Sequence, residues 1–464
     1  MANVKLMRLK IDKYRNVAPG TELVFNDTFN IPLGQNGTGK TTLLDLIAMV
    51  VKSDFSKLKD EEFLLEFDVC FLSIIVVSAR IENRYRKSAD VAPHKVGQLS
   101  LDMSTIMAET LEWEYSAAVN FKADVLYPKF ELKVSPHSSE LRLESGETHD
   151  VTDAFFLSPF ESSLLASVLM LSTNMSFSDS TSITSTNEEL QARSVQVASA
   201  FDTSKQVQLN LTRNAGRFDE ALGGFDAITG SYSGVRGGDL ERARLRIRRR
   251  KEKIINSSWA FVPGEIRERL IQDSSSALGS QDFRLSSSTL PFLHKVVEIF
   301  NLKSADVVLR LVQKEPGGIE KISYGNFEFI ITLDDGTTIR QDLLSYGQKR
   351  LLSFFYYVAA INDIVIADEL VNGLHYDWIE ACLREIGDCQ SFLTSQNPLL
   401  LDFLTFESAE QVKRTFILCR TEKRDGKNLM VWSNMSDEAA ETFFRAYKTE
   451  ALQVNEILRS RGLW

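Results

Sequence analysis

The chain has 464 residues, enough for about three domains, and its 44% hydrophobic and 25% charged composition is ordinary for a globular protein with large cores. Its formal net charge of −10 excludes a generic polyanion binder, so any contact with nucleic acid must come from a local basic patch. Apolar runs such as Ile74 to Val77 are too short to cross a bilayer, which predicts a protein without a membrane span. The four cysteines form no C-x-x-C pair and favour free thiols in the cytoplasm.

The N-terminal segment predicts three strands followed by a helix. Residues 4–14 alternate apolar and polar side chains from the start of the chain, with no secretory signal before them. Residues 22–25 and 29–33 predict two more strands. Proline is unusual in a central strand, so we expect Pro32 to mark the end of the second one. Apolar side chains at helical spacing predict a helix over residues 40–51.

The remainder of the chain predicts a β-rich region, a linker, a helical region and a final mixed region. Residues 62–157 are β-rich, with strand candidates at 64–71, 72–79, 99–103, 111–115, 130–134, 141–143 and 155–157. The Ser/Thr-rich residues 172–187 predict a linker, and residues 188–310 predict mainly helices. The last region predicts a hairpin over residues 327–340 with an Asp-Asp-Gly turn, and helices over 348–361, 437–447 and 450–459.

A phosphate-binding loop stands between the third predicted strand and the first helix. Residues 34–41, GQNGTGKT, fit the Walker A pattern G-x-x-x-x-G-K-[ST] at every required position. In such a loop Lys40 would reach the β- and γ-phosphates of ATP, and the hydroxyl of Thr41 would ligate Mg²⁺. Glycines permit the tight curl of the loop, and backbone N–H groups surround the phosphates. The predicted nucleotide-binding residues of the loop are Gly34, Asn36, Gly37, Thr38, Gly39, Lys40, Thr41 and Thr42.

Two adjacent acids follow an apolar strand far downstream. Residues 364–367, IVIA, precede Asp368 and Glu369, which is a Walker B pattern with a carboxylate directly after it. Asp368 would hold a Mg²⁺-bound water, and Glu369 would polarise the water that attacks the γ-phosphate. These parts occur in the order expected for one α/β ATPase domain with a long insertion between its two lobes.

With these motifs the chain resembles ABC-type P-loop ATPases of the SMC/RecF class. Residues 344–348, LSYGQ, resemble the LSGGQ signature of that class, with Tyr in the third place. The resemblance implies that Ser345, Gly347 and Gln348 act in trans, because the signature of one subunit contacts the γ-phosphate bound by another. A serine hydroxyl at a helix N-terminus is a suitable phosphate clamp. It also implies self-association, as an ATP-dependent dimer or a dimer-based higher oligomer such as a hexamer.

Other family segments have counterparts with departures. Residues 372–375, NGLH, resemble the D-loop, and Arg15 stands where the class has a strand-end arginine near the nucleotide; an exposed strand-end arginine is the alternative. The switch histidine is replaced by Gln396, which can donate to a phosphate oxygen but cannot carry a proton. We therefore predict slow hydrolysis. Residues 158–161, where a Q-loop is expected, contain no Gln.

A dense cationic run lies in the predicted helical region. It comprises Arg242, Arg244, Arg246, Arg248, Arg249, Arg250, Lys251 and Lys253. On a helix these side chains would cover most of the circumference. Two interpretations stay open: a solvated helix paired with acidic neighbours, or a surface for a polyanion such as DNA, RNA or a highly acidic protein.

The pattern divides the chain into an N-terminal ATPase lobe with an antiparallel β subdomain (1–160), a compact helical insertion (161–310) and a C-terminal ATPase lobe (311–464). The 66 residues from 399 to 464 are too few for a fused Toprim nuclease. In size and motif order the chain resembles the ATPases of prokaryotic anti-phage systems, namely the PARIS type and, as a near alternative, the Septu type. This resemblance implies a separate Toprim-type nuclease effector and an acidic phage trigger protein, which could be a DNA mimic. A RecF/SMC-like DNA-binding ATPase of repair or recombination is the alternative.

Overall fold

The structure is a computed structural model, and it forms two compact units. Unit 1 comprises residues 1–212, 406–452 and 456–464, and unit 2 comprises residues 213–405 and 453–455. The structure describes residues 4–71, 75–85, 111–121, 130–135, 138–143, 148–150, 218, 245–250, 253–258, 262–272, 282–361, 364–449 and 452–463.

Unit 1 contains an eight-stranded antiparallel sheet in the order β2-β1-β4-β5-β6-β7-β8-β9. The predicted antiparallel β subdomain is thereby confirmed, although β5 and β6 are longer than expected and β9 was not predicted. The candidate strands 99–103 and 155–157, the linker 172–187 and the Q-loop segment 158–161 lie outside the described residues. The strands are β1 Val4–Tyr14, β2 Thr21–Val24, β4 Phe63–Phe71, β5 Ile75–Tyr85, β6 Leu111–Phe121, β7 Phe130–Val134, β8 Ser139–Leu143 and β9 Thr148–Asp150.

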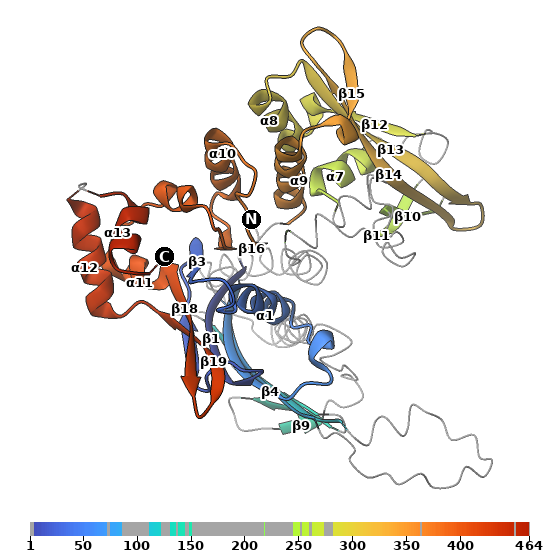
Figure 1. Cartoon of the computed structure of the whole chain (residues 1–464). Coiled ribbons are helices and arrows are strands. Elements are labelled where there is room, and N and C mark those ends of the chain that lie inside the picture. Colours follow the sequence, from blue (N-terminus) through green and yellow to red (C-terminus); the bar gives the residue numbers. More distant parts are fainter. Residues whose placement is uncertain are drawn as a thin grey trace, which may run out of the picture. The chain divides into compact units, whose positions relative to one another are not determined.

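A second group of elements in unit 1 joins both ends of the chain. The strand β3 (Phe29–Leu33) pairs in parallel with β18 (Phe416–Arg424), which pairs antiparallel with β19 (Lys427–Asn434). β3 ends one residue after Pro32, close to the expected end. The predicted helix is α1 (Lys40–Lys52), and its Leu43, Leu44 and Ile47 are fully buried. In Figure 1 the blue N-terminal and red C-terminal segments share this region.

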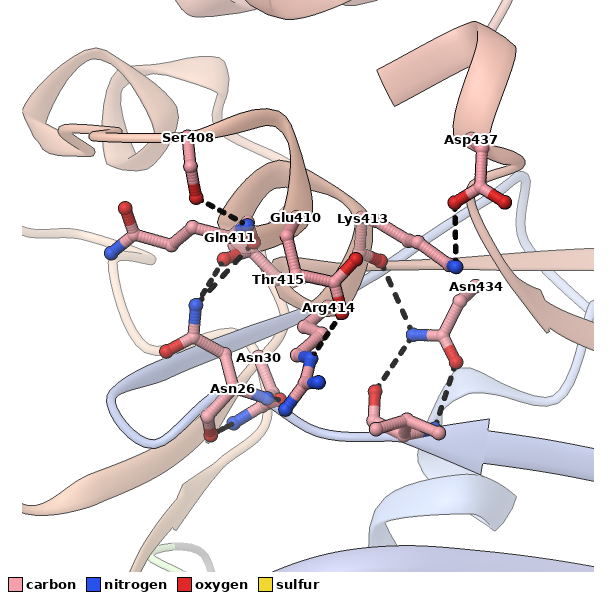
Figure 2. A network of polar contacts seen from close by, with 11 residues as sticks. Asn26, Asn30, Ser408, Glu410, Gln411, Lys413, Arg414, Thr415, Asn434 and Asp437 are labelled. Atoms are coloured by element: carbon pink, nitrogen blue, oxygen red, sulfur yellow. Dashed lines mark hydrogen bonds and ion pairs between the residues drawn. The ribbon is translucent and has the colours of Figure 1, made fainter. Parts of the chain in front are cut away.

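A polar network ties the N-terminal strands of unit 1 to the helix α11 (Ala409–Thr415), as Figure 2 shows. The amide of Asn26 donates to the hydroxyl of Thr415 at 3.0 Å. The side chain of Asn434 accepts from the Val24 N–H at 2.8 Å and donates to the Val24 carbonyl at 2.9 Å. Since buried polar groups cost free energy when unpaired, these bonds fix the two chain ends against each other.

Unit 2 contains a sheet in the order β11-β10-β14-β13-β12, with β15 paired to β14. The long antiparallel pair β13–β14 is visible in Figure 1, and the β14–β15 pair confirms the predicted hairpin. The helices α7 and α8 come between strands of this sheet in sequence. The elements are β10 Leu245–Arg250, β11 Lys253–Ser258, α7 Gly264–Gln272, β12 Phe283–Ser286, α8 Pro291–Ile299, β13 Ser304–Glu315, β14 Glu320–Thr332 and β15 Thr338–Arg340.

The cationic run is a strand where its described residues lie, so the helix expected there is wrong. Leu245 and Ile247 of β10 are buried while Arg246 and Arg248 are exposed, which is the two-residue period of a strand. The described part of residues 161–310 therefore mixes strands with helices, and the compact helical insertion is corrected on this point. Arg242, Arg244 and Lys251 lie outside the described residues.

The remaining elements of unit 2 carry the downstream motifs. The helix α9 (Tyr346–Ala360) and the strand β16 (Ile364–Ala367) agree with prediction, and β16 pairs in parallel with β17 (Gln390–Leu393). The helix α10 (Tyr376–Ile386) lies between them in sequence. Toward the C-terminus, α12 (Asp437–Lys448) of unit 1 and α13 (Val454–Ser460), most of which also belongs to unit 1, confirm the last two predicted helices. Within the described residues, the longest apolar helical stretches fall short of a membrane span.

Candidate functional site

The backbone of the phosphate loop has the shape that its glycines permit. Gly37 and Gly39 have φ of 84° and 86°, in the left-handed region that L side chains avoid. A Cβ on Gly34 would lie 2.1 Å from the carbonyl oxygen of Cys419, and one on Gly39 would lie 2.2 Å from the sulfur of Met430. The loop thus forms a cradle without side chains at these positions, which fits a chain of phosphate groups brought close to backbone N–H donors.

Lys40 and the N-terminus of α1 supply positive charge at this cradle. The Lys40 ammonium donates to the carbonyls of Gly34 at 2.7 Å and of Gln35 at 3.1 Å, so it lies over the loop. The N-cap residue Gly39 gives α1 no side-chain cap. The start of a helix without such a cap favours anions through its dipole and its N–H groups. Thr41, the proposed Mg²⁺ ligand, is exposed in the first turn.

Trp432 and Met430 of strand β19 contact the phosphate loop, which was not predicted. The indole Nε1 of the buried Trp432 donates to the Thr38 carbonyl, and Met430 packs at Gly39. The carbonyl of Met430 also accepts from the Ala18 N–H at 2.8 Å. Burial raises the pKa of the neighbouring Cys419 thiol to about 12, so that thiol is neutral. No local sequence pattern marks Trp432 as part of the loop.

Arg15 is engaged with another residue of unit 1. Its guanidinium forms a bidentate ion pair with Glu61, with both nitrogen–oxygen distances at 2.8 Å, and lies 5.1 Å from the centre of the Tyr14 ring. The bond to Glu61 raises the pKa of Arg15. These contacts explain a structural role for Arg15. A contact with nucleotide stays a prediction.

In unit 2 the Walker B acids are held by their neighbours in a defined geometry. Glu369 has a φ of 50°, a left-handed conformation that costs a non-glycine residue about 1–2 kcal/mol. Its N–H donates to the Thr394 hydroxyl at 3.0 Å, and that hydroxyl donates to Asp368. Thr394, at the end of β17, thus links the two acids. It was not predicted as a site residue, although it belongs to the switch segment, residues 394–398.

The switch segment contacts the Glu369 carboxylate through its backbone. The Gln396 N–H donates to Glu369 Oε2 at 3.0 Å, whereas the Gln396 residue is exposed. The backbone of Gln396 therefore lies beside the Walker B glutamate within unit 2. The role of its side chain at a phosphate stays a prediction.

The signature segment begins the helix α9 with a capping box. Gln348 N–H donates to the Ser345 hydroxyl at 3.3 Å, and Ser345 N–H donates to the Gln348 side chain at 3.0 Å. Gly347 packs against the D-loop, because a Cβ there would lie 2.7 Å from the Gly373 carbonyl oxygen. Ser345 is exposed at the helix start, and its action on another subunit stays a prediction.

A buried arginine of α9 also reaches the Walker B segment, and it was not predicted. Arg350 is 8% exposed and donates to the carbonyls of Glu369 at 2.6 Å and Leu370 at 3.0 Å. The one signal in the sequence is an arginine five residues after the signature serine, inside an apolar helix.

The basic strand β10 has two faces of different character. Arg249 forms an ion pair with Glu320 at 2.7 Å and its side chain is 11% exposed. Arg246, Arg248 and Arg250 are exposed on the opposite face. A hollow on that face is lined by both charged and uncharged polar side chains, among them Arg246, Arg248, Gln313, Lys321 and Ser323.

No protein-family model and no curated protein matches the chain. Solved structures that match include an SMC head bound to the C-terminal winged-helix domain of ScpA, with 11% identity, a TM-score of 0.37 and coverage of 93% of this chain and 98% of that chain. The SMC head domain from Thermotoga maritima matches with 10% identity, a TM-score of 0.31, and coverage of 93% and 99%. The recombination mediator protein RecF matches with 12% identity, a TM-score of 0.31, and coverage of 94% and 99%. Because these TM-scores are low, the function proposed below is based on the site residues.

Proposed function

We propose that the protein is an ABC-type ATPase that binds ATP and hydrolyses it slowly. The observation that carries the proposal is the glycine cradle of residues 34–39, with Lys40 folded over it and the uncapped start of α1 beside it. A triphosphate has the charge and the narrow cross-section that such a cradle accepts.

The acids of unit 2 suit the hydrolytic step. The Glu369 carboxylate, fixed by the Gln396 N–H, would orient and polarise the attacking water. Thr41 of unit 1 and Asp368 of unit 2 are each proposed as Mg²⁺ ligands, because hydroxyl and carboxylate oxygens are ligands that Mg²⁺ prefers, and the ion would supply charge neutralisation on the phosphate oxygens. Since Gln396 cannot carry a proton, we expect slow turnover that suits a switch.

Self-association follows from the exposed signature. Ser345 and the N-terminus of α9 would clamp a γ-phosphate held by a second copy, so ATP would act as part of the dimer contact. We also propose assemblies built on such dimers, including a hexamer.

The ATP affinity, the rate of ATP hydrolysis and the mass of the assembly test this proposal together. Titration calorimetry should show ATP binding that Lys40→Ala weakens about 10- to 100-fold, because the variant cannot make a charge-assisted hydrogen bond to phosphate. Glu369→Gln should retain ATP binding, reduce turnover about 100-fold and accumulate an ATP-bound dimer in light scattering. Equal ATP affinity of the wild type and Lys40→Ala would exclude the phosphate-loop assignment.

We propose further that the ATPase is the sensor of an anti-phage defence system, most similar to AriA of PARIS, with PtuA of Septu as the near alternative. In this role it holds a separate Toprim-type nuclease and releases it when an acidic phage protein binds. Motif order, the size of the insertion and Gln396 support this interpretation. Co-purification with the product of a neighbouring gene tests it: a Toprim nuclease supports PARIS, and an HNH nuclease supports Septu.

A RecF/SMC-like DNA-binding ATPase of repair is the second candidate, favoured by the exposed arginines of β10. It predicts ATP hydrolysis that is stimulated by duplex DNA. An ATPase rate unchanged by DNA, together with capture of a nuclease, would decide against it.

A further inference from the structure

The signature helix holds the backbone of the Walker B glutamate within unit 2. We propose that Arg350 is a positioning residue that couples the signature motif to Glu369 of the same chain. Through Arg350, the state of the ATP clamped by Ser345 would control Glu369, the proposed catalytic glutamate of the same chain. The inference rests on the proposed ATPase function.

The contacts of Arg350 are directed at one short stretch of backbone. Nη2 donates to the Glu369 carbonyl at 2.6 Å, and Nε donates to the next carbonyl, that of Leu370, at 3.0 Å. A planar guanidinium can bridge two successive carbonyls in a fixed orientation, which a flexible lysine cannot do as rigidly. The same Glu369 carbonyl accepts from the Asn372 N–H at 3.2 Å, so the D-loop shares this anchor.

The surroundings fix the guanidinium in place. Its centre lies 5.2 Å from the centre of the Phe218 ring, and that ring packs edge-on against Phe354 of α9 at 5.3 Å. Burying a cation is unfavourable unless its donors are satisfied, and the acceptors seen here are main-chain carbonyls. A buried arginine directed at carbonyls is a costly way to stabilise a fold, and this cost favours a role in holding a specific backbone conformation.

The backbone conformation of Glu369 is strained, so it requires contacts that stabilise it. Glu369 has a φ of 50°, which its side chain disfavours, and its carboxylate direction depends on that dihedral angle. Arg350 binds the carbonyl on one side of the residue, and Thr394 binds the N–H on the other. When Arg350 moves with α9, the Glu369 backbone loses one of these two anchors.

Arg350 is linked directly to the signature motif, because Ser345 and Arg350 both lie at the start of α9. Ser345 is the N-cap of α9, and Arg350 lies between one and two turns later on the same rigid helix. Gly347 packs against Gly373 of the D-loop and forms a second contact between the same two segments. A shift of α9 on clamping a partner's γ-phosphate is thereby transmitted to Glu369.

A double-mutant cycle in ATP turnover tests the inference. Arg350→Met keeps the apolar stem and removes the donors. We expect kcat to fall about tenfold while ATP affinity, measured by calorimetry, stays unchanged, since misplacing a catalytic group costs turnover. In the Glu369→Gln background the same substitution should change kcat by less than about twofold, because Arg350 acts through Glu369. Arg350→Lys should restore part of the lost turnover.

A control variant is measured in the same assay of ATP turnover. Arg384→Met on α10 removes an arginine whose side chain is 72% exposed and paired with Glu380, and it should leave kcat unchanged. Wild-type kcat in Arg350→Met, or a loss that persists in full on top of Glu369→Gln, would overturn the inference. If Arg350→Met fails to fold, the cycle with Arg350→Lys decides by the same criterion. Absence of Glu369-dependent hydrolysis in the wild type would instead refute the proposed function, and the inference with it.

Discussion

The indole Nε1 of Trp432 donates a 3.1 Å hydrogen bond to the carbonyl oxygen of Thr38, in the middle of the phosphate loop. The bond directs that carbonyl toward the buried indole of Trp432. Strand β19 therefore shapes the loop, although almost the whole length of the chain separates the two in sequence.

Trp432→Phe should weaken ATP binding by removing this bond while keeping an aromatic ring in the core. A neutral hydrogen bond contributes about 0.5–1.5 kcal/mol, so we expect affinity to fall about 2- to 13-fold and the melting temperature to drop. Calorimetry and thermal denaturation measure both effects. The tryptophan emission of the wild type should also change on ATP addition. Unchanged affinity in Trp432→Phe would show that β19 does not shape the loop.

Gly39→Ala and Gly37→Ala form a matched pair. Both glycines have positive φ, but a Cβ on Gly39 would meet Met430 and Trp432, whereas a Cβ on Gly37 meets nothing within 4 Å. Gly37→Ala should therefore cost only the conformational strain of about 1–2 kcal/mol. Gly39→Ala should cost more stability, because core atoms must move as well.

Thermal and urea denaturation of the two variants give the comparison directly. Equal free energies of unfolding would contradict the close packing at Gly39. ATP titration adds a second readout, and Gly39→Ala should show the larger loss of affinity, since the start of α1 would shift with the loop.

The phosphate loop and its helix could be predicted because their signal is local. Glycines of the Walker pattern and the apolar stripe of residues 43–51 lie next to each other in sequence, and α1 begins at the expected Lys40. The contacts of Trp432 with Thr38 and of Arg350 with Glu369 could not be predicted. They depend on how distant strands and helices pack, which composition and periodicity do not specify.

The helix expected for the cationic run is wrong because periodicity outweighs charge density in this segment. Residues 245–250, LRIRRR, place Leu245 and Ile247 two residues apart, and both are buried in the sheet with Ile322 and Tyr324 opposite them. A strand buries alternate side chains, whereas a helix would have left the arginines on every side. The alternation is present in the sequence and is the better guide.

Gln396→His should raise the rate of ATP hydrolysis. A histidine near Glu369 can accept and release a proton, which the glutamine amide cannot do. The Gln396 N–H bond to Glu369 comes from the backbone, so the substitution leaves that bond in place. Steady-state turnover measures the effect, with ATP affinity as the control. Turnover that stays at the wild-type rate would count against a switch role for this side chain.

The exposed arginines of β10 should bind a polyanion through one face of the sheet. Arg246 and Arg248 line a hollow with Lys321, although Lys321 forms an ion pair at 2.8 Å with Glu315, whose negative charge offsets its positive potential. The double variant Arg246→Glu/Arg248→Glu should abolish binding of a duplex DNA or of a poly-glutamate probe. ATP binding should remain, because the phosphate loop lies in unit 1.

Arg249→Gln on the same strand provides the control, since Arg249 faces Glu320 from the other side. It should lower stability, because it removes the ion pair with Glu320, and it should leave polyanion binding intact. The salt dependence of polyanion binding gives a second comparison between Arg249→Gln and variants of Arg246 and Arg248. For duplex DNA, removing one arginine that binds a phosphate should reduce the slope of log K against log salt by about 1. If Arg249→Gln and the double variant weaken binding equally, the exposed face of β10 is not the surface that binds the polyanion.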